Sequence, residues 1–168
     1  MTRPKTGCFF CERLNPPGPL PGFTLYADDV LHASHWWEED RDTYLGQIVV
    51  QSVRHTPHGL ASLTDDEGAR VGVVVARLAR ALRSTLSARW AYTFGFTEGF
   101  RHYHQFVVAR YAGTPAEHVR LGVLDWPEAP RGNAAEIRRR CARLRREVAS
   151  PTGSPYEQPL VAPHTVQA

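Results

Sequence analysis

The sequence predicts a single α+β domain, in which an antiparallel sheet of about five strands carries one long helix on one face and a second helix near the C-terminus. Five short runs have strand composition, and two longer stretches repeat apolar side chains at the spacing of a helix. With 168 residues, of which 42% are hydrophobic, the chain can enclose one core but is short for two. We therefore expect one domain over residues 1–150.

The overall composition restricts the class of partner. The formal net charge is +3 and the pI is 9.0, and the basic residues are scattered or confined to one face of each helix, as a solvated surface requires. This balance fits a small anionic ligand and does not favour nucleic acid. No apolar segment follows Met1–Gly7, and no run approaches about 18 consecutive apolar residues. We expect a cytoplasmic protein without a membrane partner.

Two segments contain closely spaced prolines. Asn15–Gly22 has too many of them for a helix or a central strand, so a loop is expected there. In residues 151–168, prolines interrupt any pattern and little apolar area is available to offset the entropy of ordering. We expect this C-terminal tail to be mobile.

The first three strand candidates lie before residue 54. Phe23–Tyr26 and Val30–Ala33 flank Ala27–Asp29, whose aspartates suit a tight turn, so the two runs predict a hairpin. Gly46–Val53 is a longer run of strand-forming residues. It predicts a third strand, which Arg54–Gly59 ends.

The long helix begins after Thr64. Thr64-Asp65-Asp66-Glu67 is a capping box with additional negative charge at the positive end of the helix dipole. Apolar residues then recur at three- and four-residue spacing through Leu86, which predicts one buried face. The residues expected to be buried against the sheet are Val71, Val74, Leu78 and Leu82, and those expected to be exposed are Arg77 and Arg80.

The remaining elements are two paired strands and a last helix. Trp90–Phe96 and Arg101–Arg110 have strand composition, and the turn at Thr97–Gly99 makes them antiparallel neighbours. Asn133, with Glu136 three residues later, predicts the start of the last helix. Its expected buried stripe is Ile137, Cys141, Leu144 and Val148, so Cys141 should be a small core residue and not a reactive thiol.

Two histidines on the last predicted strand are the first residues that indicate a functional site. Successive side chains of a strand point to opposite faces, so His102, His104 and Phe106 share a face. Imidazoles placed in this way can be metal ligands, a nucleophile with its orienting partner, or buried polar groups that need only hydrogen-bond partners. Taken alone, the pair favours the last of these interpretations.

The cysteines supply the second signal. Cys8-Phe9-Phe10-Cys11 has the spacing of two ligands of a tetrahedral zinc site, and His55 and His102 could complete a Cys2His2 set. The two histidines lie too far along the chain for a zinc finger, so the fold would have to assemble the site. A thioredoxin-like redox pair is the competing interpretation, but it requires a helix after a βαβ strand, which the proline-rich segment does not provide. The odd total of three cysteines does not favour a disulfide framework.

Together, these features resemble the histidine triad (HIT) family of nucleotide-binding hydrolases and transferases. The resemblance covers about residues 8 to 113 and rests on the CxxC, the strand that leads to Arg54-His55, the capped helix and the stretch His102-Tyr103-His104-Gln105-Phe106-Val107-Val108. The family pattern in that last stretch is His-φ-His-φ-His-φ-φ, in which φ is apolar. Its zinc-bearing bacterial members also carry an N-terminal CxxC.

The resemblance implies a metal site, a nucleophile and an oligomeric state. The metal ligands would be Cys8, Cys11, His55 and His102. Zinc with four protein ligands has no open position, so the metal would be structural. His104 would attack the α-phosphorus of a nucleoside phosphate ester, anhydride or phosphoramidate and form a nucleotidyl-histidine intermediate. The family usually forms dimers through the long helix and the sheet, so a homodimer is expected.

Four further residues define the substrate site that the resemblance implies. Phe106 stands at the third histidine position and offers no donor, and the loss of one such donor can cost ~3 kcal/mol of transition-state stabilisation. Gly99 stands where many family hydrolases have a phosphate-binding serine, and Gln47 stands where many relatives have another histidine. Glu98 lies at the turn before His102. These departures leave two alternatives open: a binding module that retains a nucleotide or another anion, and a scaffold redirected to zinc-dependent chemistry on a non-nucleotide metabolite.

Overall fold

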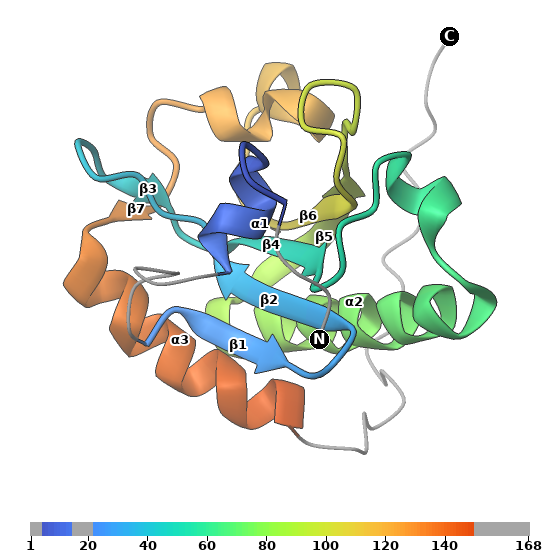
Figure 1. Ribbon diagram of the computed structural model, residues 1–168. Coiled ribbons are helices and arrows are strands. Elements are labelled where there is room, and N and C mark those ends of the chain that lie inside the picture. The colour runs from blue at the N-terminus through green and yellow to red at the C-terminus, as the bar shows by residue number, and fades with distance from the viewer. Residues whose placement is uncertain (1–4, 15–21, 150–168) are drawn as a thin grey trace, which may run out of the picture.

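The structure is a computed structural model that describes residues 5–14 and 22–149. The predicted tail at 151–168 and all of the predicted proline-rich loop except Gly22 lie outside these residues. Among the described residues, five strands form one antiparallel sheet in the order β1-β2-β4-β6-β5, which confirms the predicted fold class (Figure 1). The strands of this sheet are β1 (Thr24–Ala27), β2 (Leu31–His35), β4 (Gln47–Ser52), β5 (Ala88–Phe94) and β6 (His104–Tyr111).

Short elements connect these strands. β3 (Thr43–Tyr44) and β7 (Arg131–Gly132) form a separate two-stranded ladder. This ladder was not predicted, because two residues per strand leave no periodic signal in the sequence. In the described part of the chain, three 3-10 helices complete the connections, namely η1 (Gly59–Ser62), η2 (Ala116–His118) and η3 (Arg120–Asp125).

The long helix α2 (Asp65–Leu86) starts as predicted. The Thr64 side chain accepts a hydrogen bond from the Glu67 backbone N–H, and the Glu67 carboxylate accepts one from the Thr64 N–H. The residues expected on its buried face are buried in the main hydrophobic core. Arg80 is exposed, but Arg77 is half-buried, so the predicted exposure of Arg77 was wrong. The Arg77 side chain lines a surface hollow with Tyr26 of the hairpin, where its aliphatic stem can lie over apolar surface.

Leu78→Ala should lower the free energy of unfolding by about 2–5 kcal/mol, because Leu78 is fully buried and its truncation leaves a cavity. Denaturant unfolding at constant pH measures the change. Val73→Ala is the matched control, since Val73 lies on the same helix with half of its surface exposed and should change stability by no more than about 0.5 kcal/mol. A loss below about 1 kcal/mol for Leu78→Ala would contradict the assigned packing face.

The C-terminal helix α3 (Ala134–Ala149) belongs to the same core. It lies along β1 and packs against α2 (Figure 1), and all four residues of its predicted stripe are buried. The Asn133 side chain accepts hydrogen bonds from the N–H groups of Ala135 and Glu136, as its cap position predicts. Burial raises the pKa of the Cys141 thiol to about 12, so the thiol stays protonated.

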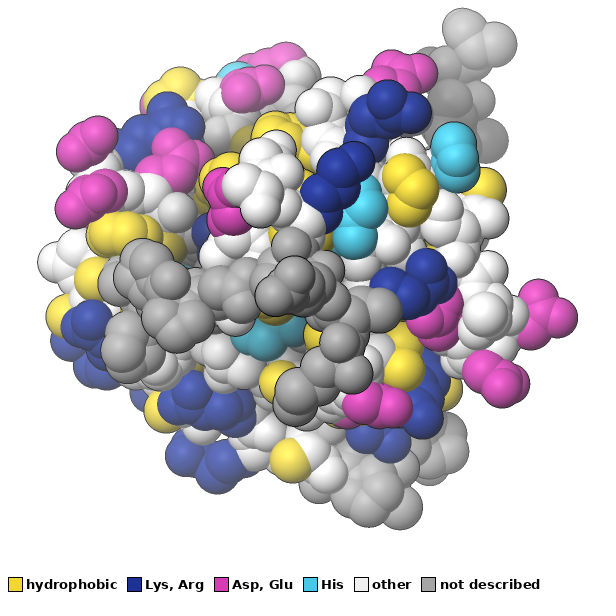
Figure 2. All heavy atoms as spheres, viewed as in Figure 1, with side chains coloured by type: hydrophobic (Ala, Val, Ile, Leu, Met, Phe, Trp, Pro, Cys, Tyr) yellow, Lys and Arg dark blue, Asp and Glu magenta, His cyan; other side chains and the backbone are white. Residues whose placement is uncertain are grey.

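The outer face of α3 is basic. Figure 2 shows basic side chains gathered over this helix, and Arg138, Arg139, Arg143 and Arg146 are exposed there. Within the described residues, no helix is long and apolar enough to cross a membrane.

A second, smaller core forms on the other face of the sheet. The short helix α1 (Phe9–Arg13) packs there, with Phe10 and Cys11 against Val49 of β4. Every residue of β4 is therefore buried, because both faces of this central strand are covered. The side chains of His104 and Phe106 lie on the α1 face, across from Gln51 and Val49 in the register of β4 and β6.

Candidate metal centre and the histidine strand

Four predicted ligands meet at the edge of the α1 core. Cys8 is the N-cap of α1 and Cys11 lies within this helix, whereas His55 follows β4 and His102 lies two residues before the start of β6. One potential ligand atom from each residue lies within 4.8 Å of all the others. Sequence positions that are far apart are thus brought together by the fold, as the Cys2His2 hypothesis requires.

The separations match the edges of a zinc tetrahedron. The Cys8 Sγ lies 3.4 Å from the His102 Nδ1, the Cys11 Sγ lies 3.5 Å from the same atom, and the Cys11 Sγ lies 3.4 Å from the His55 Nδ1. Tetrahedral zinc with ordinary Zn–S and Zn–N bond lengths places sulfur and nitrogen ligands about 3.6 Å apart. The four residues therefore fit a zinc ion bound through the two sulfurs and the two Nδ1 atoms.

The hydrogen bonds of His102 leave its Nδ1 free to bind a metal ion. Its Nε2–H donates to the Ser52 carbonyl oxygen at 2.8 Å, so the Nδ1 lone pair faces the sulfurs. A ligand histidine usually has such an outer hydrogen bond, which fixes both its tautomer and its ring orientation. Burial lowers the pKa of the His102 imidazole and raises that of the Cys11 thiol, and metal binding would displace the thiol proton.

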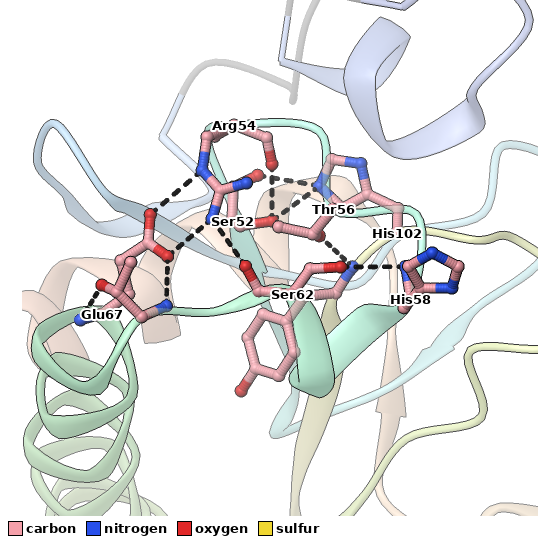
Figure 3. Close-up of polar contacts among 9 residues, drawn as sticks. Ser52, Arg54, Thr56, His58, Ser62, Glu67 and His102 are labelled. Atoms are coloured by element: carbon pink, nitrogen blue, oxygen red, sulfur yellow. Dashed lines mark hydrogen bonds and ion pairs between the residues drawn. The ribbon is translucent and has the colours of Figure 1, made fainter.

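The loop that carries His55 is anchored to the start of α2. The Arg54 guanidinium forms two hydrogen bonds with the Glu67 carboxylate, at 2.7 and 3.2 Å, and donates to the Ser62 carbonyl oxygen at 2.8 Å (Figure 3). The His58 N–H donates to the Ser62 hydroxyl at 3.1 Å. Because Arg54 immediately precedes His55, this ion pair helps to hold the candidate ligand His55 in place.

His104 has a fixed orientation next to this centre. Its Nδ1–H donates to the His102 carbonyl oxygen at 2.9 Å, which leaves Nε2 unprotonated with a free lone pair. Burial lowers the pKa of the imidazole, so the neutral form dominates at pH 7. The residue is only 4% exposed.

Aromatic rings surround the His104 imidazole. Phe10 stacks on it with the ring centroids 4.2 Å apart and the planes 20° apart, and Phe100 presents its edge at 5.6 Å. Phe106 lies 6.1 Å away, and Trp36 packs against the Phe106 ring at 5.4 Å. α1 carries Phe10 between Cys8 and Cys11, so the helix that holds the two candidate cysteine ligands also places this ring over His104.

Comparison with solved structures identifies the fold. A zinc-bound histidine triad family protein from Mycobacterium smegmatis is similar with a TM-score of 0.59 and 22% identity, covering 85% of this chain and 94% of that one. A HIT-like protein involved in cell-cycle regulation from Bartonella henselae has a TM-score of 0.62 and 15% identity, with 87% and 99% covered. The chain has the histidine triad fold.

A third neighbour extends the comparison. A hypothetical histidine triad nucleotide-binding protein from Sulfolobus tokodaii has a TM-score of 0.60 and 16% identity, and the match covers 84% of this chain and 91% of that one. No family model and no curated protein sequence matches the chain. The likeness is therefore one of structure, and it extends over most of both chains.

In this histidine triad fold, the other predicted substrate residues lie at different distances from His104. Glu98 and Gly99 are exposed in the turn before Phe100, whose ring reaches His104. Gln47 shares a sheet face with His104, but it pairs with Val108, so about 13 Å of strand separates the two positions. The fold thus brings the turn close to His104 and leaves Gln47 at the far end of the face.

Phe10 and Phe100 were not expected near His104. Phe10 lies between the two cysteines, so a ligand set that joins α1 to His102 already requires it to approach the histidine strand. Phe100 carried no comparable signal, because its position depends on the path of the turn. Arg101 has a φ of 46°, a left-handed conformation that is uncommon outside glycine, and it leads the chain directly into His102.

Gly95→Ala should destabilise the protein by about 1–3 kcal/mol, because a Cβ there would lie 2.5 Å from the His104 backbone oxygen and the strands would have to separate. Chemical denaturation measures this change. Gly72→Ala is the control: a Cβ on Gly72 of α2 meets no atom within 4 Å, so this change should stabilise by up to about 1 kcal/mol. Equal stability of Gly95→Ala and the unmodified protein would contradict the close approach of Gly95 to β6.

Proposed function

We propose that the protein is a nucleotidyl hydrolase or transferase that uses His104 as its nucleophile and holds a structural zinc at Cys8, Cys11, His55 and His102. The observation that carries the proposal is the hydrogen bond from the His104 Nδ1–H to the His102 carbonyl oxygen. It fixes the tautomer in which Nε2 has a free lone pair, as a nucleophilic imidazole requires. The nucleotide-binding description of the Sulfolobus tokodaii neighbour is consistent with this substrate class.

The proposed reaction has two displacement steps at one phosphorus atom. The lone pair of the His104 Nε2 attacks the α-phosphorus, a P–N bond forms, and the bond from phosphorus to the leaving group breaks with its electron pair. The leaving group takes its proton from solvent, because Phe106 has none to donate. Water or a phosphate then attacks the same phosphorus, the P–N bond breaks, and its electron pair returns to Nε2. When water attacks, its proton goes to solvent.

The bound zinc would supply rigidity rather than reactivity, since four protein ligands leave no open coordination position. The side chains around the metal centre would position the reacting groups. Cys8 and Cys11 hold α1 and thereby Phe10, while His102 holds the backbone that orients His104. We assign Glu98, Gly99 and Phe106 to substrate contacts near the phosphorus. Gln47 would contact only a substrate that extends about 13 Å along the sheet face.

A second candidate function is supported by the apolar surroundings of His104. Three phenylalanine rings contact this histidine, and Phe106 offers no donor to a phosphate oxygen. A site of this kind could retain a nucleotide or another anion without turnover, or it could act on a non-nucleotide metabolite with zinc taking part directly. Two outcomes would distinguish this candidate from the nucleotidyl enzyme. One is binding of a nucleotide without turnover, and the other is turnover of a non-nucleotide substrate.

The proposal includes a homodimer, as the resemblance to histidine triad proteins implies. β5 is an edge strand of the sheet, and its Trp90 side chain is 47% exposed. An exposed aromatic residue on an edge strand is consistent with a covered surface in the assembled protein. Light scattering coupled to size exclusion should give twice the chain mass, and a monomer at micromolar concentration would contradict this part of the proposal.

The activity test uses substrates from each proposed class. Adenosine phosphoramidate, a dinucleoside polyphosphate and a nucleotide sugar are each incubated with the zinc-loaded protein, and nucleoside monophosphate release is measured by chromatography. The sugar nucleotide is also tested with inorganic phosphate or a sugar phosphate as acceptor. Release that exceeds the rate of His104→Ala supports the proposal. Equal rates for both proteins on every substrate would contradict it and favour the second candidate.

A further inference from the structure

One peptide group connects His104 to a buried threonine. The carbonyl oxygen of the His102–Tyr103 peptide accepts the hydrogen bond from the His104 Nδ1–H at 2.9 Å. The N–H of the same peptide donates to the Thr56 Oγ1 at 2.7 Å. Because a peptide group is planar, its N–H and its carbonyl cannot turn independently. The Thr56 hydroxyl therefore restrains the group that orients His104.

The direction of each hydrogen bond around Thr56 follows from the available hydrogens. The Ser52 hydroxyl donates to the Arg54 carbonyl oxygen at 2.8 Å, so its single hydrogen is used (Figure 3). The Thr56 hydroxyl must then be the donor in its 3.0 Å contact with the Ser52 Oγ. This leaves the Thr56 oxygen as an acceptor for the Tyr103 N–H. The network has one consistent orientation.

Water cannot easily replace these interactions. Thr56 and His102 are 0% exposed, and Ser52 and Tyr103 are 1% and 3% exposed. A buried N–H without a partner is costly, so the Tyr103 peptide would turn toward another acceptor if the Thr56 oxygen were removed. Such a turn would move the His102 carbonyl oxygen away from the His104 Nδ1.

We propose that Thr56 is a positioning residue for His104, which acts through the His102–Tyr103 peptide to hold the imidazole in the tautomer with Nδ1 protonated. The assignment of a catalytic consequence rests on the function proposed above, but the tautomer itself does not. Thr56 directly follows the proposed ligand His55, so the same loop would contribute to the metal centre and to the orientation of the nucleophile. Chains of hydrogen bonds reinforce one another, so the two bonds of this peptide should strengthen together.

The test measures the His104 tautomer by long-range 1H–15N correlation of the histidine rings in the zinc-loaded protein at pH 7. His104→Gln assigns the signals. Thr56→Val removes the hydroxyl and keeps the side-chain shape, whereas Thr56→Ser removes the methyl group and keeps the hydroxyl. Thr114→Val is the matched control, because Thr114 is also buried but its hydroxyl donates to the Tyr111 carbonyl oxygen, away from the histidines.

Thr56→Val should retain zinc and give His104 signals averaged between two tautomers, whereas Thr56→Ser and Thr114→Val should give the single tautomer of the unmodified protein. If Thr56→Val does not fold, Thr56→Ala is used, in which a mobile water beside the Tyr103 N–H should give the same averaging. A single Nδ1–H tautomer in the folded variant would overturn the proposal. Loss of zinc from that variant would also overturn it, because Thr56 would then act on the metal centre.

Measurement of turnover distinguishes a failure of the positioning role of Thr56 from a failure of the proposed nucleotidyl activity. If nucleotide turnover is present, Thr56→Val should lower kcat about ten- to hundredfold with little change in KM, as expected for a misplaced nucleophile. If the unmodified protein has no turnover, the proposed function fails while the tautomer measurement still decides the role of Thr56.

Discussion

Cys8→Ala should release the bound zinc and lower the thermal stability of the protein in the same step. Removal of one sulfur leaves three ligands, and structural zinc sites contribute about 10–16 kcal/mol of apparent binding free energy in zinc-finger peptides, where binding is coupled to folding. The unmodified protein, purified without chelator, should contain about one zinc per chain. Elemental analysis and thermal unfolding of the same samples measure both effects.

Cys141→Ala is the matched control for this measurement. Cys141 is also buried, but it lies in α3 and its thiol donates to the Phe23 carbonyl oxygen, outside the candidate metal centre. The control variant should therefore retain zinc, although truncation of a core side chain lowers its stability modestly. Unmodified protein that is free of metal and fully folded would contradict the zinc assignment.

His104→Ala should abolish nucleotide turnover while the fold and the zinc content remain unchanged. The reason is geometric: His104 is the proposed nucleophile and stacks on Phe10, but it is not among the four residues that converge on the metal centre. Removal of a covalent nucleophile costs several orders of magnitude in rate. His118→Ala, on η2, is the control and should keep full activity. Loss of zinc from His104→Ala would show that His104 belongs to the coordination sphere.

Phe106→His should increase the turnover rate if the nucleotidyl mechanism holds. The introduced imidazole restores a donor at the position where the resemblance expects one, and such a donor contributes ~3 kcal/mol, about a hundredfold in rate, when it is well placed. The gain should appear in kcat with a small change in KM, since the donor acts mainly in the transition state. Loss of activity on the physiological substrate would instead favour a pocket built around the phenylalanine ring.

Local signals explain which parts of the fold were predictable. The capping box at Thr64 and the apolar spacing through Leu82 act within one helix, so the sequence alone determines them. The same holds for the stripe of α3. The boundaries of β6 were less accurate: the strand begins at His104, two residues after the predicted first histidine, because His102 leaves the ladder to face the cysteines.

The candidate site was predictable in its ligand types but not in its packing. A CxxC and two histidines on separate segments are the residue types of a zinc site, but they form one only if the fold brings them together. The stacking of Phe10 on His104 depends on how α1 crosses the sheet, and the distance of Gln47 depends on the register of β4 against β6. The role of Thr56 requires hydrogen-bond directions between segments far apart in the sequence, which no local pattern encodes.

The covalent intermediate provides the most direct test of the proposed function. The zinc-loaded protein is mixed with adenosine phosphoramidate, quenched in alkaline denaturant because a phosphoramidate P–N bond is labile to acid, and analysed by intact mass followed by peptide mapping. We expect a mass increase of one adenylyl group, located on His104 and absent from His104→Ala. An adduct on another residue, or turnover with no adduct at any time after mixing, would contradict the proposed function.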